Sequence, residues 1–217
     1  MKALIVWGGW DGHTPRETAE VLAAALRENG FEVEISSTLD AFSDEAHLAS
    51  FDVVSPVWTM GSLTAEQWRG LNQAVRGGVG FAGVHGGAGD AFRDNLEYQW
   101  MVGGQFVGHP HTGDYTVRLT RNKSPITRGM KSSFRYKSEQ YYMIVDPGIR
   151  ILAETIYRYN GQNIKMPVIW TKTWGKGRVF YSSLGHCAQE FRDYPAVLDM
   201  TVKGFRWAAE GKAAAGR

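Results

Sequence analysis

The stretch "GFAGVHGGAGD" (residues 80–90) runs from an apolar segment directly into a glycine-rich turn that carries a histidine. Continuous apolar runs of this kind are typical of strands that are buried on both faces of a sheet. The glycines around His85 indicate a backbone that turns tightly or is closely approached by its neighbours. The stretch therefore predicts a strand-to-helix corner with His85 at its tip.

The segments before this corner repeat the same alternation of strand and helix. Buried strands are expected at "KALIVWGG" (2–9) and "FDVVSPVW" (51–58), and a half-exposed strand is expected at "FEVEIS" (31–36). One helix is expected after Thr14 and Pro15, and another is expected between Thr64 and Gly77. Residues 1–90 thus read β-α-β-(loop or short helix)-β-α-β, which predicts an α/β protein with a parallel sheet covered on both faces.

The second half of the chain has a less regular pattern. We expect a short helix within "NLEYQWMVGGQF" (95–106), strands at "YTVRLT" (115–120) and "GIRILAET" (148–155), and a hairpin around "WGKG" (174–177). A terminal helix opens at Pro195. No linker or internal repeat interrupts the chain, so we predict a single domain over residues 1–210 and a frayed tail over residues 211–217.

Composition excludes several classes of protein. The 217 residues are 43% hydrophobic and 21% charged, which favours a globular protein. The net charge is only +2, and the lysines and arginines form no basic stripe that would bind nucleic acid. The single cysteine excludes an internal disulfide framework, and no apolar run approaches the ~18 residues of a membrane span. No nucleotide-binding glycine motif is present, so no nucleotide cofactor is expected. A cytoplasmic protein is the expectation, and the sequence leaves open whether it forms a homo-oligomer.

Three of the six histidines follow predicted strands: His13, His85 and His186. In open parallel sheets, ligands bind beyond the carboxyl ends of the strands, so these side chains should meet at one sheet edge. A single loop histidine is often only a solvent-exposed residue with one hydrogen bond, and His13 could simply cap the following helix. The coincidence of all three positions nevertheless favours a functional site.

Two further segments carry polar side chains suited to chemistry. His109 and His111 lie in a predicted glycine-rich loop, "GGQFVGHPHTGD" (103–114), where residues two apart in an extended chain point the same way and could share a metal or an anion. Glu139 and Tyr141 lie in "YKSEQYYMI" (136–144), where a carboxylate beside phenols could bind hydroxyls or move protons. The alternative for this second segment is an ordinary strand with one exposed face.

The order and spacing of these segments resemble the ThuA-like (trehalose utilisation) family of the class I glutamine amidotransferase-like superfamily. The resemblance runs nearly end to end, through "ALIVWGGWDGH", "GVGFAGVHGG", "GGQFVGHP", "SEQYY" and "MPVIWTKTWGKGRVFYSSLGH". It implies a flavodoxin-like three-layer α/β/α sandwich with a mostly parallel sheet. Class I amidotransferases carry a nucleophilic cysteine at the corner that holds His85 here, so glutamine hydrolysis is not expected of this chain.

The resemblance implies a role in using trehalose or related disaccharides, with sugars or 3-keto sugars as substrates of a hydrolase, lyase or isomerase type of enzyme. A keto sugar has acidified protons beside its ketone, and removing one requires a base and an electrophile. The expected catalytic residues are His85, Glu139, His13 and His186. A divalent metal, Zn or Mn, could be held by His13, His85, His109 and His186. The sugar would be contacted by Trp10, Asp11, His109, His111, Tyr141 and Trp170.

Two other functions are compatible with the sequence. A non-catalytic sugar-binding or regulatory module would explain the aromatic residues and the missing nucleophile, but it would leave the histidines unexplained. A hydrolase acting through Cys187 is the other alternative, although nothing places this cysteine on a tight corner, and a buried structural thiol is the usual case.

Overall fold

A computed structural model describes residues 1–215. Its centre is one nine-stranded sheet in the order β2-β1-β3-β4-β9-β8-β7-β5-β6. The first five strands in this order are parallel to one another, and the remaining neighbours pair antiparallel. The parallel strands are β1 (Lys2–Gly9), β2 (Glu32–Ser36), β3 (Val53–Thr59), β4 (Gly80–Val84) and β9 (Gly177–Ser182).

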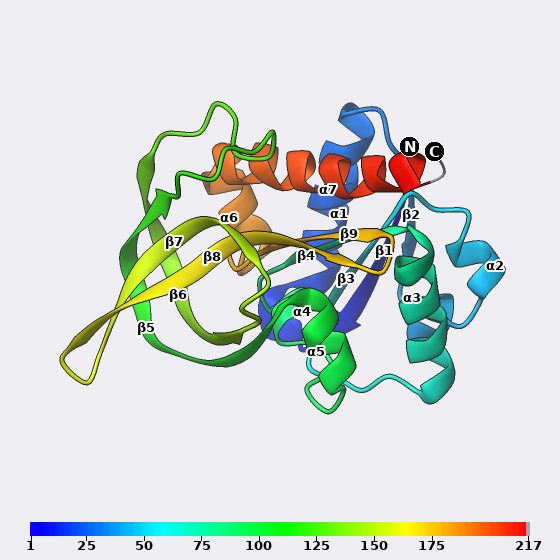
Figure 1. The fold of residues 1–217 in the computed structure, drawn as a ribbon, viewed down its shortest axis with the longest axis horizontal. Helices are drawn as coiled ribbons and strands as arrows, with labels where there is room; N and C mark the ends of the chain where they lie inside the picture. Colours follow the sequence, from blue (N-terminus) through cyan, green and yellow to red (C-terminus); the bar gives the residue numbers. More distant parts are fainter. Residues whose placement is uncertain (216–217) are drawn as a thin grey trace.

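Two separate cores cover the two faces of the parallel strands. Alternation along β1 sends Ala3 and Ile5 to one core and Leu4 and Val6 to the other. The first core is closed by α1 (Pro15–Glu28), α6 (Ala188–Asp193) and α7 (Pro195–Ala215). The second is closed by η2 (Leu39–Phe42), α2 (Glu45–Leu48), α3 (Ala65–Gly77), α4 (His85–Gly89) and α5 (Leu96–Val102). In Figure 1, α7 lies above β9, whereas α4 and α5 lie below it. The predicted three-layer α/β/α sandwich is confirmed.

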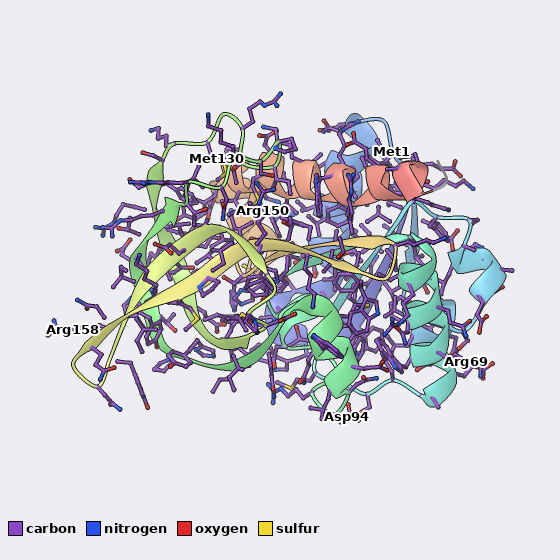
Figure 2. The ribbon with its side chains drawn as sticks, viewed as in Figure 1. Met1, Arg69, Asp94, Met130, Arg150 and Arg158 are labelled. Atoms are coloured by element: carbon purple, nitrogen blue, oxygen red, sulfur yellow. The ribbon has the colours of Figure 1, made fainter. Side chains whose placement is uncertain are left out.

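The antiparallel part is larger than the sequence predicts. It contains β5 (Gly104–Leu119), β6 (Ser133–Val145), β7 (Arg150–Tyr159) and β8 (Gln162–Trp174). The predicted hairpin around residues 174–177 is confirmed, since Trp174 pairs with Gly177. The β7–β8 hairpin projects from the body with Arg158 near its tip (Figure 2). The strands curl enough for the Met143 N–H of β6 to reach the Met166 sulfur of β8, at 3.4 Å.

Residues 103–114, predicted as a glycine-rich loop, belong almost entirely to β5, so that prediction is wrong. The segment pairs antiparallel with β6, and register shifts between Phe106 and Gly108 and between Gly108 and His111 accommodate its glycines and proline. These irregularities hide the strand from a periodicity argument, because each bulge resets the alternation of side chains.

The end of the chain also differs from expectation. Helix α7 continues to Ala215, so the frayed tail predicted over residues 211–217 is helical as far as residue 215, and residues 216–217 lie outside the described residues. Lys212 extends from α7 to donate hydrogen bonds to the backbone carbonyls of Ala49 and Phe51. Within residues 1–215, no helix is both long and apolar enough to span a membrane.

An ion pair stabilises the junction between the antiparallel strands and α5. Lys172 of β8 donates to Asp146 at 2.6 Å and to the Trp100 carbonyl, and the two charged side chains are only 7% and 19% exposed. The hydrogen bond from Lys172 lowers the pKa of Asp146, and the Gly148 N–H lowers it further. A carboxyl group with a depressed pKa stabilises the fold above its unfolded pKa of about 3.9 and loses that contribution as pH falls through the folded value.

We expect Asp146→Asn to lower the free energy of unfolding by about 1.5–3 kcal/mol at pH 7, the range for hydrogen bonds to charged groups. The difference from the unsubstituted protein should shrink as pH falls below ~4, because the unfolded chain is protonated there first and the folded carboxyl group follows at its lower pKa. Urea unfolding at pH 7 and pH 3 measures both effects. Asp94→Asn, at an exposed loop residue (Figure 2), is the control and should change little at either pH. An equal loss at both pH values would contradict the role of the charge.

Candidate functional site

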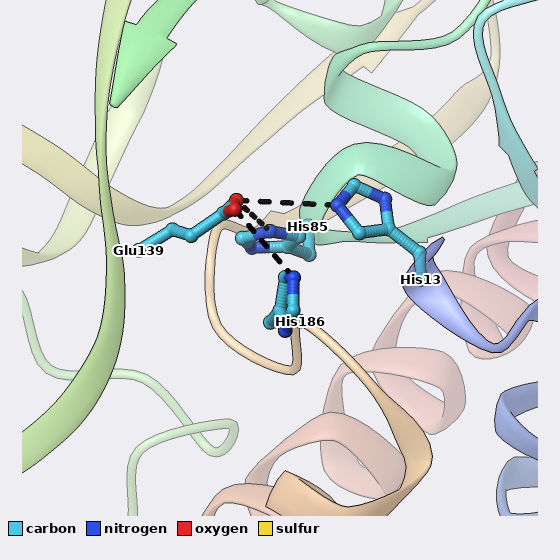
Figure 3. Close-up of side chains that lie close together, drawn as sticks. All are labelled: His13, His85, Glu139 and His186. Carbon is cyan, nitrogen blue, oxygen red and sulfur yellow. Dashed lines mark hydrogen bonds and ion pairs between the residues drawn. The ribbon is translucent and has the colours of Figure 1, made fainter. Parts of the chain in front are cut away.

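Four side chains converge at the carboxyl ends of the parallel strands: His13, His85, Glu139 and His186. Their ligand atoms all lie within 4.8 Å of one another, and Figure 3 shows the carboxylate facing the three imidazoles. His13 ends η1 (Asp11–His13) after β1, His85 begins α4 after β4, and His186 lies in the loop after β9. Glu139 comes from β6, the edge strand of the antiparallel part of the sheet. The predicted convergence of the three post-strand histidines is confirmed, although the role of each residue stays a prediction.

His85 occupies the tight corner that the sequence predicts. Its backbone has φ of 41°, a left-handed conformation that non-glycine residues seldom adopt. The glycine that follows is required by its neighbours, because a Cβ on Gly86 would stand 2.4 Å from the His13 ring. Strained backbone of this kind persists where the surrounding structure holds it in place, and it is concentrated at functional sites.

Each histidine points its Nε2 atom toward Glu139 and has a second group near its Nδ1 atom. The distances from Nε2 to the nearer carboxylate oxygen are 3.9 Å for His13, 3.2 Å for His85 and 3.6 Å for His186. At Nδ1, His13 contacts the Thr59 hydroxyl at 2.7 Å, and His85 donates to the Ser183 carbonyl at 2.8 Å. Three imidazoles therefore direct the same atom at one point.

The geometry around His85 calls for a positive charge between the rings and the carboxylate. Because its Nδ1–H is donated to a carbonyl, a neutral His85 would present a lone pair to Glu139, which is also an acceptor. Either a second proton or a metal ion would resolve this opposition.

The protonation states of the other groups are those of metal ligands. Burial, reinforced by repulsion from His85 and His186, lowers the pKa of His13 to about 3, and burial also lowers the pKa of His186. Burial alone would raise the pKa of Glu139, but the hydrogen bond from His85 and the charges of the histidines outweigh it and lower this pKa to about 2. Neutral imidazoles and an ionised carboxylate need lose no proton before they bind a cation.

The four donor groups fit a divalent transition metal. Zinc takes histidine nitrogens and carboxylate oxygens in tetrahedral sites, and metal-bound histidines usually donate their other ring N–H to a carbonyl, hydroxyl or carboxylate. His85 and His13 have such partners in Ser183 and Thr59. The only cysteine, Cys187, does not belong to this group of potential ligands within residues 1–215.

The predicted pairing of His109 with His111 is wrong. His109 turns toward the cluster, with its Nε2 atom 3.5 Å from Glu139, whereas the exposed ring of His111 contacts the Asp114 carbonyl on its own strand. The irregular register between Gly108 and His111 breaks the two-residue alternation that would have placed both rings together. His109 lies beside the four-residue cluster, and 42% of its side chain is exposed.

The predicted aromatic contacts separate into three environments. Trp10 is 47% exposed and its ring stands edge-on to His13 at 4.8 Å, and the neighbouring Asp11 is also exposed. Tyr141 is buried under His85, with ring centres 4.0 Å apart, and burial raises the pKa of its hydroxyl well above the usual value. Trp170 is wrong as a sugar-contacting residue, because it is completely buried, packs on Tyr181 and donates its indole N–H to the Val102 carbonyl.

The residues that support the histidines are not among those predicted from the sequence. Thr59 ends β3, and the Ser183 carbonyl carries no signal in the sequence, because every residue has one. Glu190 accepts a hydrogen bond from the His186 N–H at 3.0 Å, and its Oε1 atom is 3.9 Å from the imidazole. The four-residue spacing of His186, just before α6, and Glu190, within it, is a signal that could have identified this pair.

Comparisons with known proteins agree with this fold. ThuA-like proteins from Parabacteroides merdae and Bacteroides uniformis superpose with TM-scores of 0.79 and 0.78, at 21% and 20% identity. The matches cover 98% and 96% of this chain and 91% of each of those chains. The glutaminase domain of Trypanosoma brucei CTPS, solved with bound acivicin, superposes with a TM-score of 0.58 at 14% identity, over 98% of this chain and 94% of that one. These likenesses show a shared fold.

A search among curated proteins finds no match for the sequence. The family model described as "Trehalose utilisation" matches residues 2–208, a range that includes every residue of the cluster. The chain therefore belongs to the ThuA, or trehalose utilisation, family.

Proposed function

We propose that the protein is a metal-assisted enzyme that moves protons on a sugar or a 3-keto sugar. The observation that carries the proposal is the convergence of His13, His85, His186 and Glu139 on one point, with their ligand atoms within 4.8 Å of one another. The carbohydrate substrate is suggested by the description of the family, trehalose utilisation. A divalent ion held by these groups would polarise a ketone oxygen and stabilise the negative charge that develops on it.

His109 is suited to the proton transfer itself. Its side chain lies next to Glu139 but outside the four-ligand group, and its exposure lets it reach a bound substrate and exchange protons with water. The imidazole would accept the proton from the carbon beside the ketone, while the electrons of that C–H bond form the enolate. Trp10, exposed beside His13, offers an apolar face for the sugar ring.

Metal content is the first test. Protein purified without added metal should contain about one divalent ion per chain, and removal of that ion by a chelator should abolish proton exchange at the carbons beside the ketone of a 3-keto disaccharide in D2O. Elemental analysis and proton NMR provide the two measurements, and adding Zn²⁺ or Mn²⁺ should restore exchange. Full activity in a protein shown to be free of metal would rule out the metal-assisted mechanism.

A matched pair of histidine variants tests the role of the exposed imidazole. We expect His109→Ala to reduce the exchange rate by about 10²-fold or more, the lower range for loss of general acid–base catalysis, with the metal content unchanged. His111→Ala changes the neighbouring histidine that faces away from the cluster, and it should have little effect on the rate. Equal losses in both variants would indicate a general disturbance of β5 and would contradict an acid–base role for His109.

A further inference from the structure

His186 is the least firmly held of the three clustered histidines. Its side chain is 26% exposed, compared with 8% for His13 and 2% for His85. It lies in the irregular segment between β9 and α6, and its Nδ1 atom stands 3.9 Å from the Glu190 carboxylate, beyond hydrogen-bond distance. The partners of the other two histidines are more than an ångström closer, at 2.7 and 2.8 Å. The direction in which the His186 ring points must therefore be fixed by other contacts.

Those contacts come from a buried pair, Tyr136 and Glu190. One carboxylate oxygen of Glu190 accepts both the His186 backbone N–H, at 3.0 Å, and the Tyr136 hydroxyl, at 2.5 Å. The same hydroxyl accepts the Gly185 N–H at 3.0 Å, and Tyr136 is completely buried. Two consecutive backbone N–H groups of the segment are thus tied to this pair, which we call the Tyr136–Glu190 clamp.

The clamp also connects the segment to the strand that carries Glu139. Tyr136 and Glu139 lie three residues apart on β6, so one strand fixes both the carboxylate of the cluster and the backbone beside His186. Glu190 adds a negative charge on the Nδ1 side of the imidazole, opposite to Glu139 on the Nε2 side. A carboxylate at Nδ1 favours the tautomer with its proton on that atom and leaves the Nε2 lone pair free to bind a metal.

We propose that Tyr136 and Glu190 are positioning residues that hold His186 as a metal ligand, with its Nε2 atom directed at the site. Neither residue belongs to the four-residue cluster, and both would act through the backbone and the Nδ1 side of His186. The inference rests on the metal site of the proposed function, but it concerns metal affinity and the His186 tautomer and does not depend on the reaction.

The test measures Co²⁺ and Zn²⁺ binding to the full chain by titration and by the visible absorption of Co²⁺. Glu190→Gln keeps the size of the side chain and removes its charge, so we expect affinity to fall about 10–100-fold, as is usual when a partner of a ligand is lost. Tyr136→Phe removes only the hydroxyl and should weaken binding less, with a change in the Co²⁺ spectrum that reports altered ligand geometry.

Two control variants make similar changes without removing any group of the clamp. Asp193→Asn removes a carboxylate from the same helix, α6, at a residue paired with Gln189. Tyr194→Phe removes the hydroxyl from the ring that packs on Tyr136 at 4.4 Å, a hydroxyl that accepts the Lys137 N–H. Both should bind metal like the unsubstituted protein, and thermal unfolding should show that all four variants are folded.

Wild-type affinity in Glu190→Gln and Tyr136→Phe would overturn the proposal, and so would equal losses in the two controls. If the unsubstituted protein binds no metal at all, the metal-assisted function is wrong. The role of the clamp is then tested by the His186 tautomer in the metal-free protein. Nitrogen-15 NMR at pH 8 should show His186 with its proton on Nδ1, and Glu190→Gln should shift it toward Nε2. The same tautomer in both proteins would overturn the clamp.

Discussion

Replacing His85 with asparagine should reduce proton exchange on a 3-keto disaccharide by about 10²–10⁴-fold, the range for loss of an acid–base or ligand group. Asparagine is the informative substitution because it tolerates the left-handed backbone seen at φ of 41°, so the corner should survive. The variant lacks the Nε2 atom that stands 3.2 Å from Glu139, and it should also lose bound metal. NMR exchange rates and elemental analysis of the same sample measure both effects.

His111→Asn, the same chemical change at an exposed residue of β5, should leave both quantities unchanged. This experiment also separates an enzyme from a binding module. If the unsubstituted protein binds the disaccharide but shows no turnover, and His85→Asn retains that affinity, the protein is a sugar-binding module and the catalytic proposal is wrong.

The second large effect concerns stability. We expect Trp170→Ala to lower the free energy of unfolding by about 3–5 kcal/mol, because it removes a fully buried ring and leaves a cavity against Tyr181. It also leaves the Val102 carbonyl without the indole N–H that it accepts at 2.9 Å. Urea unfolding followed by circular dichroism measures the loss.

Trp10→Ala is the matched control, since the same residue type is 47% exposed beside the cluster. It should cost about 1 kcal/mol or less and should weaken sugar binding instead. A reversed result, with Trp10 needed for stability and Trp170 for sugar binding at unchanged stability, would contradict the assignment of the two tryptophans.

The parallel half of the fold and most of the cluster were accessible from sequence because local rules apply there. The buried strand β4 is followed directly by a glycine-rich corner with His85. The carboxyl ends of the neighbouring parallel strands bring His13 and His186 close to it. Glu139 lies within a strand of the antiparallel part, so no rule about strand ends could connect it with the histidines. A carboxylate beside phenols in "YKSEQYYMI" makes Glu139 a candidate residue, but the local pattern does not place it beside the histidines.

The predictions that were wrong also have physical explanations. A tryptophan in a core and a tryptophan at a sugar site look alike in the sequence. Only tertiary packing distinguishes the buried Trp170 from the exposed Trp10. The bulges of β5 break the two-residue period on which the pairing of His109 with His111 depended. The partners of His13 and His85 include a backbone carbonyl and a hydroxyl brought from distant strands, and these contacts exist only once the chain has folded.

The origin of Glu139 has a consequence for how the molecule opens. The three histidines belong to the parallel half, while Glu139 lies on β6, the edge strand at the opposite end of the nine-stranded order from β2. An ion shared by these groups would act as a cross-link between the two halves. Local unfolding of β5 and β6 would then require release of the ion. Amide hydrogen exchange in β5 and β6 should accordingly slow when metal is added, while exchange in β1 and β3 should respond much less.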